Sequence, residues 1–144
     1  MTGADPFDLQ RFVEAQDGVI DRVREELRRG RKASHWMWFI FPQIAGLGFS
    51  PMAQRYAITG RAEALAYLAH PVLGPRLREL TAIVTAAPEK TAHEIFGSPD
   101  DMKFRSCLTL FAAVAPEQPV FGEALRRFYD GEVDPATLER LGRP

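Results

Sequence analysis

Apolar residues recur every three or four positions along most of this chain, and Gly and Pro interrupt the pattern at short intervals. Residues 72–86 show it most clearly, because Leu73, Leu77 and Leu80 fall on one face of a helix. The chain contains 11 Gly and 11 Pro, and most helices have to be short, since Pro breaks a helix and Gly weakens it. The pattern therefore predicts a series of short helices.

Capping and breaking residues place these helices along the chain. The expected helices cover residues 6–16, 19–29, 35–41, 51–58, 62–69, 72–86, 91–96, 102–114 and 120–129, with a short turn after 135. For residues 35–41 a strand is the competing prediction, because aromatic and branched residues favour strands, but no neighbouring segment offers a partner strand. We expect one all-α domain over residues 1–144, with eight to ten short helices.

The composition is that of a globular protein without strong overall charge. Hydrophobic residues make up 46% of the 144 residues, and the formal net charge is -1, so extended nucleic acid is not expected as a partner. The N-terminus has no signal-peptide pattern, and the longest apolar run, residues 36–41, is far shorter than the ~20 residues that cross a membrane. The single Cys107 excludes an internal disulfide. A cytoplasmic protein without membrane contact is expected.

Residues 35–43, HWMWFIFPQ, hold both tryptophans of the chain. On a helix, Trp36 and Phe39 share one face, while His35 and Trp38 share another. One face can fill the core, and the second would line a groove or pack on another helix. The segment therefore forms either core alone or core together with a stacking platform for a planar ligand, where stacking contributes about 1–3 kcal/mol per base.

Basic residues occur at two places that are far apart in the sequence. Lys32 follows a predicted helix end, and Lys103 and Arg105 lie at the start of a later helix. If folding brings them together, they form an anion site, because Arg offers a fork of donors and Lys a point charge. The alternative is that they are solvated cations that complement helix ends.

A glycine loop, Gly46-x-Gly48-x-Ser50, follows the aromatic segment. It lacks the spacing and the lysine of a Walker phosphate loop. The helix that starts after Ser50 can nevertheless present free N–H groups to an anion. Orienting hydrogen bonds are expected from residues on both sides of this loop. The predicted ligand-binding residues are Lys32, Trp36, Trp38, Gln43, Ser50, Tyr56, Lys103, Arg105 and Ser106.

Two residues are candidates for acid–base chemistry if the protein is an enzyme, which the sequence leaves open. His35 has an ordinary pKa of about 6.5, near working pH, although a histidine hydrogen-bonded beside Trp is the plainer interpretation. Asp101 and its neighbour Asp100 could act as paired carboxylates or simply favour a helix start. The three histidines are scattered without metal-ligand spacing, so we expect no metal and no cofactor.

One set of motifs runs through nearly the whole chain. It comprises residues 30–43, Gly46-Leu47-Gly48, Tyr56-Ala57-Ile58, Tyr67-Leu68, residues 70–74, Ile95-Phe96-Gly97, Asp101-Met102-Lys103 and Thr109-Leu110-Phe111. Together these motifs resemble the bacterial domain of unknown function 1810. One departure is Cys107, where a second serine is common in that family, which argues against a hydroxyl-based role at this position.

The resemblance implies a compact, mainly helical single domain. Genome labels often call such proteins calpastatin, but calpastatin is a disordered, polar inhibitor, whereas this chain is apolar and periodic. The chain also has a remote similarity to the helical NADAR superfamily, whose members act on or bind ADP-ribose conjugates. That similarity implies a ligand related to ADP-ribose.

Two functions follow as hypotheses. The first is a pocket for a small anionic or nucleotide-like molecule, with the segment 35–43 as one wall. An enzymatic version would use His35 or Asp101 as acid or base. The alternative is a protein-interaction module, in which the aromatic helix is half exposed and holds an apolar partner segment.

Overall fold

A computed structural model describes residues 5–87 and 89–142, and within these residues it contains ten α-helices and no sheet. The helices are α1 (Gln10–Asp17), α2 (Ile20–Arg28), α3 (Met37–Ile40), α4 (Pro51–Arg55), α5 (Arg61–Ala69), α6 (Leu73–Thr85), α7 (Ala92–Phe96), α8 (Asp100–Val114), α9 (Pro119–Tyr129) and α10 (Pro135–Leu141). The prediction of an all-α protein with eight to ten short helices is confirmed.

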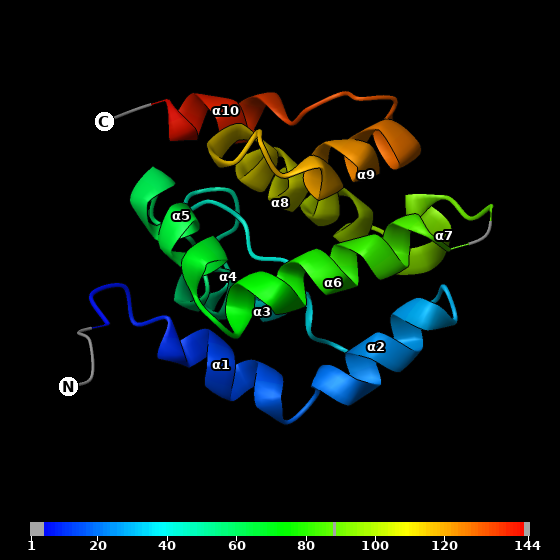
Figure 1. Ribbon diagram of the computed structural model, residues 1–144, viewed down its shortest axis with the longest axis horizontal. Helices are drawn as coiled ribbons and strands as arrows, with labels where there is room; N and C mark the ends of the chain where they lie inside the picture. Colours follow the sequence, from blue (N-terminus) through cyan, green and yellow to red (C-terminus); the bar gives the residue numbers. More distant parts are fainter. Residues whose placement is uncertain (1–4, 88, 143–144) are drawn as a thin grey trace.

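Helix α6 crosses the middle of the molecule, with α1 and α2 on one side of it and α8 and α9 on the other (Figure 1). Helix α3 lies behind α6 and packs against α1, and α10 covers α8. The short aromatic segment is therefore enclosed by long helices that the chain supplies before and after it.

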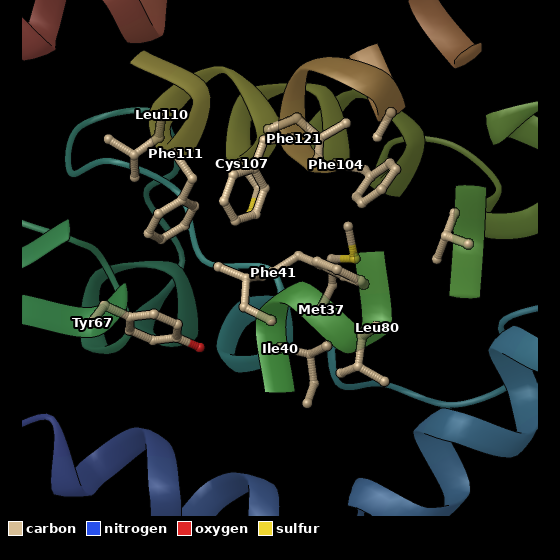
Figure 2. Packing of buried hydrophobic residues seen from close by; sticks show 14 of the residues in the cluster. Met37, Ile40, Phe41, Tyr67, Leu80, Phe104, Cys107, Leu110, Phe111 and Phe121 are labelled. Atoms are coloured by element: carbon tan, nitrogen blue, oxygen red, sulfur yellow. The ribbon is translucent and has the colours of Figure 1, made fainter. Parts of the chain in front are cut away.

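The core forms where α3 meets α8. Figure 2 shows Met37 and Phe41 directed toward Phe104, Cys107 and Phe111. The rings of Phe41 and Phe104 are 4.9 Å apart in a T-shaped arrangement, which aromatic pairs prefer to a face-to-face stack. The segment 35–43 is thus mainly core.

Several helix ends follow the predicted capping residues. Thr91 and Glu94 form a reciprocal capping box at the start of α7. Ser50 accepts a hydrogen bond from Ala53 N and caps α4. Gly30 takes a φ of +73° after α2, which glycine adopts at little cost. These local signals determine helix ends without help from the rest of the fold.

Three predicted boundaries are wrong. Helix α1 begins at Gln10 and not at residue 6, although the Asp5 carboxylate does accept hydrogen bonds from Leu9 N and Gln10 N. Helix α4 ends at Arg55 and not at residue 58, because the chain must leave it to pair with the loop at Gln43. Helix α3 covers four residues instead of seven, and Ser34 does not cap it.

The reason for the short α3 is a buried carboxylate. Glu26 accepts hydrogen bonds from Ala33 N, Ser34 N, Ser34 Oγ and Trp36 Nε1 at 2.7 to 3.1 Å. These bonds hold residues 33–36 in a bent, non-helical connection, so the helix does not start before Met37. Glu26 itself is buried, although it lies on a helix whose other acidic side chains, Asp21 and Glu25, are exposed.

An isolated parallel bridge fixes the loop after α3. Ile58 N donates to Gln43 O at 2.9 Å, and Ala45 N donates to Ile58 O at 2.8 Å. The bridge holds the glycine loop 46–50 against α4, next to the start of α8.

Candidate functional site

The two lysines predicted to form an anion site meet at one carboxylate. Lys32 Nζ lies 2.9 Å from Asp100 Oδ2, and Lys103 Nζ lies 3.6 Å from Asp100 Oδ1. The Lys32 side chain is 8% exposed, whereas that of Lys103 is 29% exposed. The anion that pairs with Lys32 is therefore the side chain of Asp100, whereas the side chain of Lys103 remains partly exposed to solvent.

Each lysine also lies over one of the two tryptophans. Lys32 Nζ is 5.1 Å from the ring centroid of Trp36, and Lys103 Nζ is 5.7 Å from that of Trp38, within the range of cation–π attraction. Trp36 is buried, and its indole N–H donates to Glu26. Trp36 thus belongs to the core, and only the half-buried Trp38 can meet a ligand.

A narrow cavity of about 100 Å³ opens beside Trp38. We call it the inner pocket; its lining includes Trp38, Phe41, Gln43, Tyr56 and Lys103. Ligand sites usually have roughly 300–1,000 Å³. The inner pocket therefore accommodates a small group of atoms and not a whole nucleotide.

A wider groove of about 480 Å³ adjoins the inner pocket. We call it the outer groove; its lining includes Phe49, Met102, Ser106 and Asp134, and it shares Lys103 with the inner pocket. Phe49 is 80% exposed and Met102 is 51% exposed. The groove has the size of an ordinary small-molecule site and apolar walls.

Close packing accounts for the two glycines of the loop 46–50. A Cβ on Gly48 would lie 2.8 Å from the Ala53 Cβ, and Gly48 lines both cavities. Gly46 has a φ of +95°, and a Cβ there would lie 2.1 Å from Arg140 Nη1. A side chain at either position would displace the wall of the site.

Ser106 belongs to a polar cluster at the outer groove. Its Oγ donates to Asp134 Oδ2 at 2.8 Å, and Thr137 Oγ1 donates to the same oxygen at 2.6 Å. Partial burial tends to raise the pKa of the Asp134 carboxyl, but the hydrogen bonds from Thr137 and Ser106 outweigh it and keep this pKa below its ordinary value. Asp134 is therefore an anion at neutral pH.

Three more of the predicted site residues, Gln43, Tyr56 and Ser50, line the inner pocket, the outer groove or both. Gln43 lines both, and its backbone carbonyl is held by Ile58 N. Tyr56 is buried in the inner pocket and accepts a hydrogen bond from Arg55 Nε at 3.3 Å. Ser50 lines the outer groove, where its Oγ is used as the helix cap.

Three predicted site residues lie elsewhere. Arg105 donates to the carbonyl oxygens of Glu132 and Val133 and so anchors the connection before α10. His35 is exposed and lines neither cavity. Asp101 also lines neither, and its Oδ2 lies 3.3 Å from His93 Nδ1 on the surface. The two candidates for acid–base chemistry, His35 and Asp101, therefore both lie outside the inner pocket and the outer groove.

Sequence reasoning did not single out Glu26 or Asp134, and it did not predict that Asp100 pairs with the two lysines. A signal existed for Glu26, because it follows Val23 by three positions and Val19 by seven, which places it on the apolar face of α2. Asp100 and Asp134 stand before or at helix starts, where carboxylates are common as caps. Their partners come from other parts of the chain, so no local pattern identifies them.

Among the described residues, no helix combines the length and the apolar character needed to span a membrane. In the same part of the chain, no three His, Cys, Asp or Glu side chains gather as they would around a metal ion.

Comparison with known proteins places the chain in a family. The family described as "Protein of unknown function (DUF1810)" matches residues 6–141. The crystal structure of the conserved hypothetical protein Rv1873 from Mycobacterium tuberculosis is similar, with 50% sequence identity and a TM-score of 0.96 over 97% of this chain and 100% of that one. No curated protein matches the sequence. This chain therefore belongs to the DUF1810 family.

Proposed function

We propose that this protein binds a small anionic molecule across the inner pocket and the outer groove, and that Lys103 contacts its anionic group. The observation that carries the proposal is the position of Lys103. Lys103 lines both cavities, its ammonium lies over the ring of Trp38, and its side chain remains partly exposed. Lys103 is the one cation among the described residues that line these cavities.

The local charges leave Lys103 available to a ligand. Lys32 lies closer to Asp100 than Lys103 does, at 2.9 Å against 3.6 Å, and it is the more buried of the two lysines. Lys32 and Asp100 balance each other, so the three groups together carry one positive charge. One ammonium is matched by one carboxylate or phosphate.

The walls favour a ligand with an apolar part. Trp38 and Tyr56 line the inner pocket, and Met102 and Phe49 line the outer groove. The inner pocket admits a small apolar group, and the body of the ligand lies in the outer groove. A relation to ADP-ribose stays a prediction from the remote similarity to the NADAR superfamily, and any nucleotide would have to occupy the outer groove.

A thermal-shift screen tests the proposal. The probes are inorganic phosphate, hexanoate, benzoate, AMP and ADP-ribose, each titrated against the full chain. A bound anion stabilises the folded state, by about 2.7 kcal/mol at 100 times its Kd. We expect at least one probe to raise Tm in a concentration-dependent way.

Two variants decide whether the shift comes from this site. Lys103→Met keeps the length and packing of the side chain but removes its charge, and it should abolish the shift. Arg31→Met removes an exposed charge outside both cavities and should retain the shift. An unchanged shift in Lys103→Met, or no shift with any probe, would contradict the proposal.

The second candidate is a protein-interaction surface. The aromatic segment itself cannot form this surface, because Trp36, Phe39 and Phe41 are buried. The exposed side chains of Phe49 and Met102 favour the outer groove as the contact instead. A partner captured by cross-linking that is lost with Phe49→Ser but kept with Lys103→Met would support this function.

A further inference from the structure

The outer groove contains two ionisable side chains of opposite sign. Among the described residues that line it, Lys103 is the one cation and Asp134 the one carboxylate. The remaining lining is apolar, amide or hydroxyl in character. A groove with one charge of each sign differs from a simple anion site, because it offers a counter-charge to a cation as well.

Asp134 is fixed in position by groups behind it. Ser106 and Thr137, both buried, donate to its Oδ2 at 2.8 and 2.6 Å, and the Asp134 backbone N–H donates to Thr109 Oγ1 at 2.9 Å. These hydroxyls orient the carboxylate and favour its charged form. In the described part of the chain, no lysine or arginine forms a salt bridge with it.

Arg105 attracts the Asp134 carboxylate electrostatically, but its hydrogen bonds go to other partners. Arg105 uses its Nε and Nη2 to bind the carbonyl oxygens of Glu132 and Val133. Hydrogen bonds from hydroxyls hold a carboxylate but do not neutralise it. The Asp134 carboxylate thus lines the groove without a salt-bridge partner among the described residues, and the charge of Arg105 attracts it only from beyond salt-bridge distance.

We propose that Asp134 forms a second subsite, for a cationic group, and that the outer groove takes a zwitterionic ligand whose anionic group contacts Lys103 and whose ammonium or guanidinium contacts Asp134. The anionic half of this inference rests on the function proposed above. The cationic half depends on Asp134 alone.

The helix α8 sets the distance between the two charges of the ligand. Lys103 and Ser106 are three positions apart on α8, so they are neighbours on one face, with about 5–6 Å between their Cβ atoms. Asp134 is hydrogen-bonded to Ser106 and forms no salt bridge with Lys103, so the two charges lie near each other without direct contact. Two separate subsites suit a ligand with several bonds between its charges better than an α-amino acid, which carries both charges at one carbon.

The wall between the subsites suits a carbon chain. Met102 and Phe49 line the same groove and expose apolar surface to it. Methylene groups that join the two charged ends would remove this surface from water, which is favourable by about 25 cal/mol per Å². The ligand class is therefore an ω-amino or ω-guanidino acid, or a larger molecule with that arrangement of charges.

Three probes of matched length test the inference on the full chain. These are 6-aminohexanoate, hexanoate and hexylammonium, and their Kd values are measured by titration at neutral pH with amide chemical shifts as the readout. We expect 6-aminohexanoate to bind about tenfold more tightly than hexanoate, because it adds a charge-assisted contact. Asp134→Asn should remove this advantage, so that 6-aminohexanoate no longer binds more tightly than hexanoate.

The control variant is Asp21→Asn, which removes an exposed carboxylate on α2 and should preserve the tenfold difference. Lys103→Met should weaken the binding of both acids. The comparison of the probes on the unmodified chain needs no variant, so it decides the matter even if Asp134→Asn does not fold.

Failure of the two proposals gives different results. Equal Kd values for 6-aminohexanoate and hexanoate overturn the cationic subsite and leave the anion site in place. Tighter binding of 6-aminohexanoate that persists in Asp134→Asn also overturns it. If neither acid binds the unmodified chain, the inference is wrong, and the function at Lys103 is then judged by its own screen.

Discussion

Lys103 lies 3.6 Å from an oxygen of Asp100, and the other oxygen of that carboxylate is held by Lys32 at 2.9 Å. One aspartate thereby joins the start of α8 to the segment before α3. The contact also divides two chemically identical side chains into different roles. Lys32 is a buried structural cation, and Lys103 is a partly exposed one that faces two cavities.

The two lysines should differ in their effect on stability. Lys32→Met leaves Asp100 with only the more distant lysine, and we expect it to lower the free energy of unfolding by about 1–3 kcal/mol. Lys103→Met should cost less than about 1 kcal/mol, since its pair is partly exposed. Urea denaturation of both variants measures the difference. Equal losses would show that the two lysines share one role.

Removing the charge of Asp100 should strengthen anion binding. In Asp100→Asn, no carboxylate at position 100 offsets the positive charge of Lys103, and none repels an anion bound there. At roughly 6 Å in water this repulsion is worth about 0.7 kcal/mol, so we expect about threefold tighter binding of the anionic probe. Calorimetric titration measures it, and weaker binding would mean that Asp100 serves to position Lys103.

Loss of the Glu26 charge should destabilise the fold. Glu26→Gln replaces one acceptor oxygen by a donor that faces the N–H and O–H groups of residues 33–36, and we expect a loss of about 2–3 kcal/mol. Glu25→Gln is the matched control, because Glu25 is exposed and paired only with Arg29; its effect should stay within about 0.5 kcal/mol. Similar values for both variants in urea denaturation would contradict the structural role of Glu26.

Glu26 should also make stability depend on pH. Burial tends to raise the pKa of this carboxyl, but the hydrogen bonds from Ala33, Ser34 and Trp36 outweigh it, so the pKa in the folded state lies below the ordinary 4.5. The carboxylate therefore contributes stability above about pH 4.5, and that contribution is lost as the pH falls through the folded-state pKa. The difference in unfolding free energy between the unmodified chain and Glu26→Gln should shrink below pH 4.5, as measured by urea titrations at several pH values. A constant difference would contradict this assignment.

Cys107 should be unreactive while the protein is folded. The side chain, which α8 carries, is fully buried among the aromatic rings of the core (Figure 2). Burial raises the pKa of its thiol well above the ordinary value, and the thiolate is the reactive form. A thiol reagent at pH 8 should label the protein in urea and leave the native protein unlabelled. Rapid labelling of the native state would show that α8 opens locally.

Much of the helical pattern could be predicted because its signals are local. Ser50 and Thr91 act on backbone groups three residues away, and Gly30 needs only its own freedom to adopt a positive φ. The wrong boundary at α3 arose from a contact over ten residues, between Glu26 and Trp36. A helix start can be overridden by a buried carboxylate, because leaving four hydrogen-bond donors without partners costs more than one turn of helix gains.

The predicted site divides in a similar way. Lys103, Trp38, Gln43, Tyr56, Ser50 and Ser106 do line the two cavities, whereas Trp36, Lys32, Arg105, His35 and Asp101 do not. Residue type indicated which side chains could bind an anion. It could not indicate which lysine and which tryptophan would be held by internal contacts. Asp100 pairs with Lys32 and Glu26 accepts a hydrogen bond from Trp36, and both contacts form only in the folded chain.

By itself, the sequence determined the all-α class and the series of short helices. It also determined the position of the aromatic segment between α2 and α4. These depend on spacing, capping and breaking residues that act within a few positions. Only the tertiary structure decided that Asp100 pairs more closely with Lys32 and leaves Lys103 at the cavities, and that Asp134, just before α10, lines the same groove. Both results depend on contacts between distant segments, whose energies exist only once the core has brought those segments together.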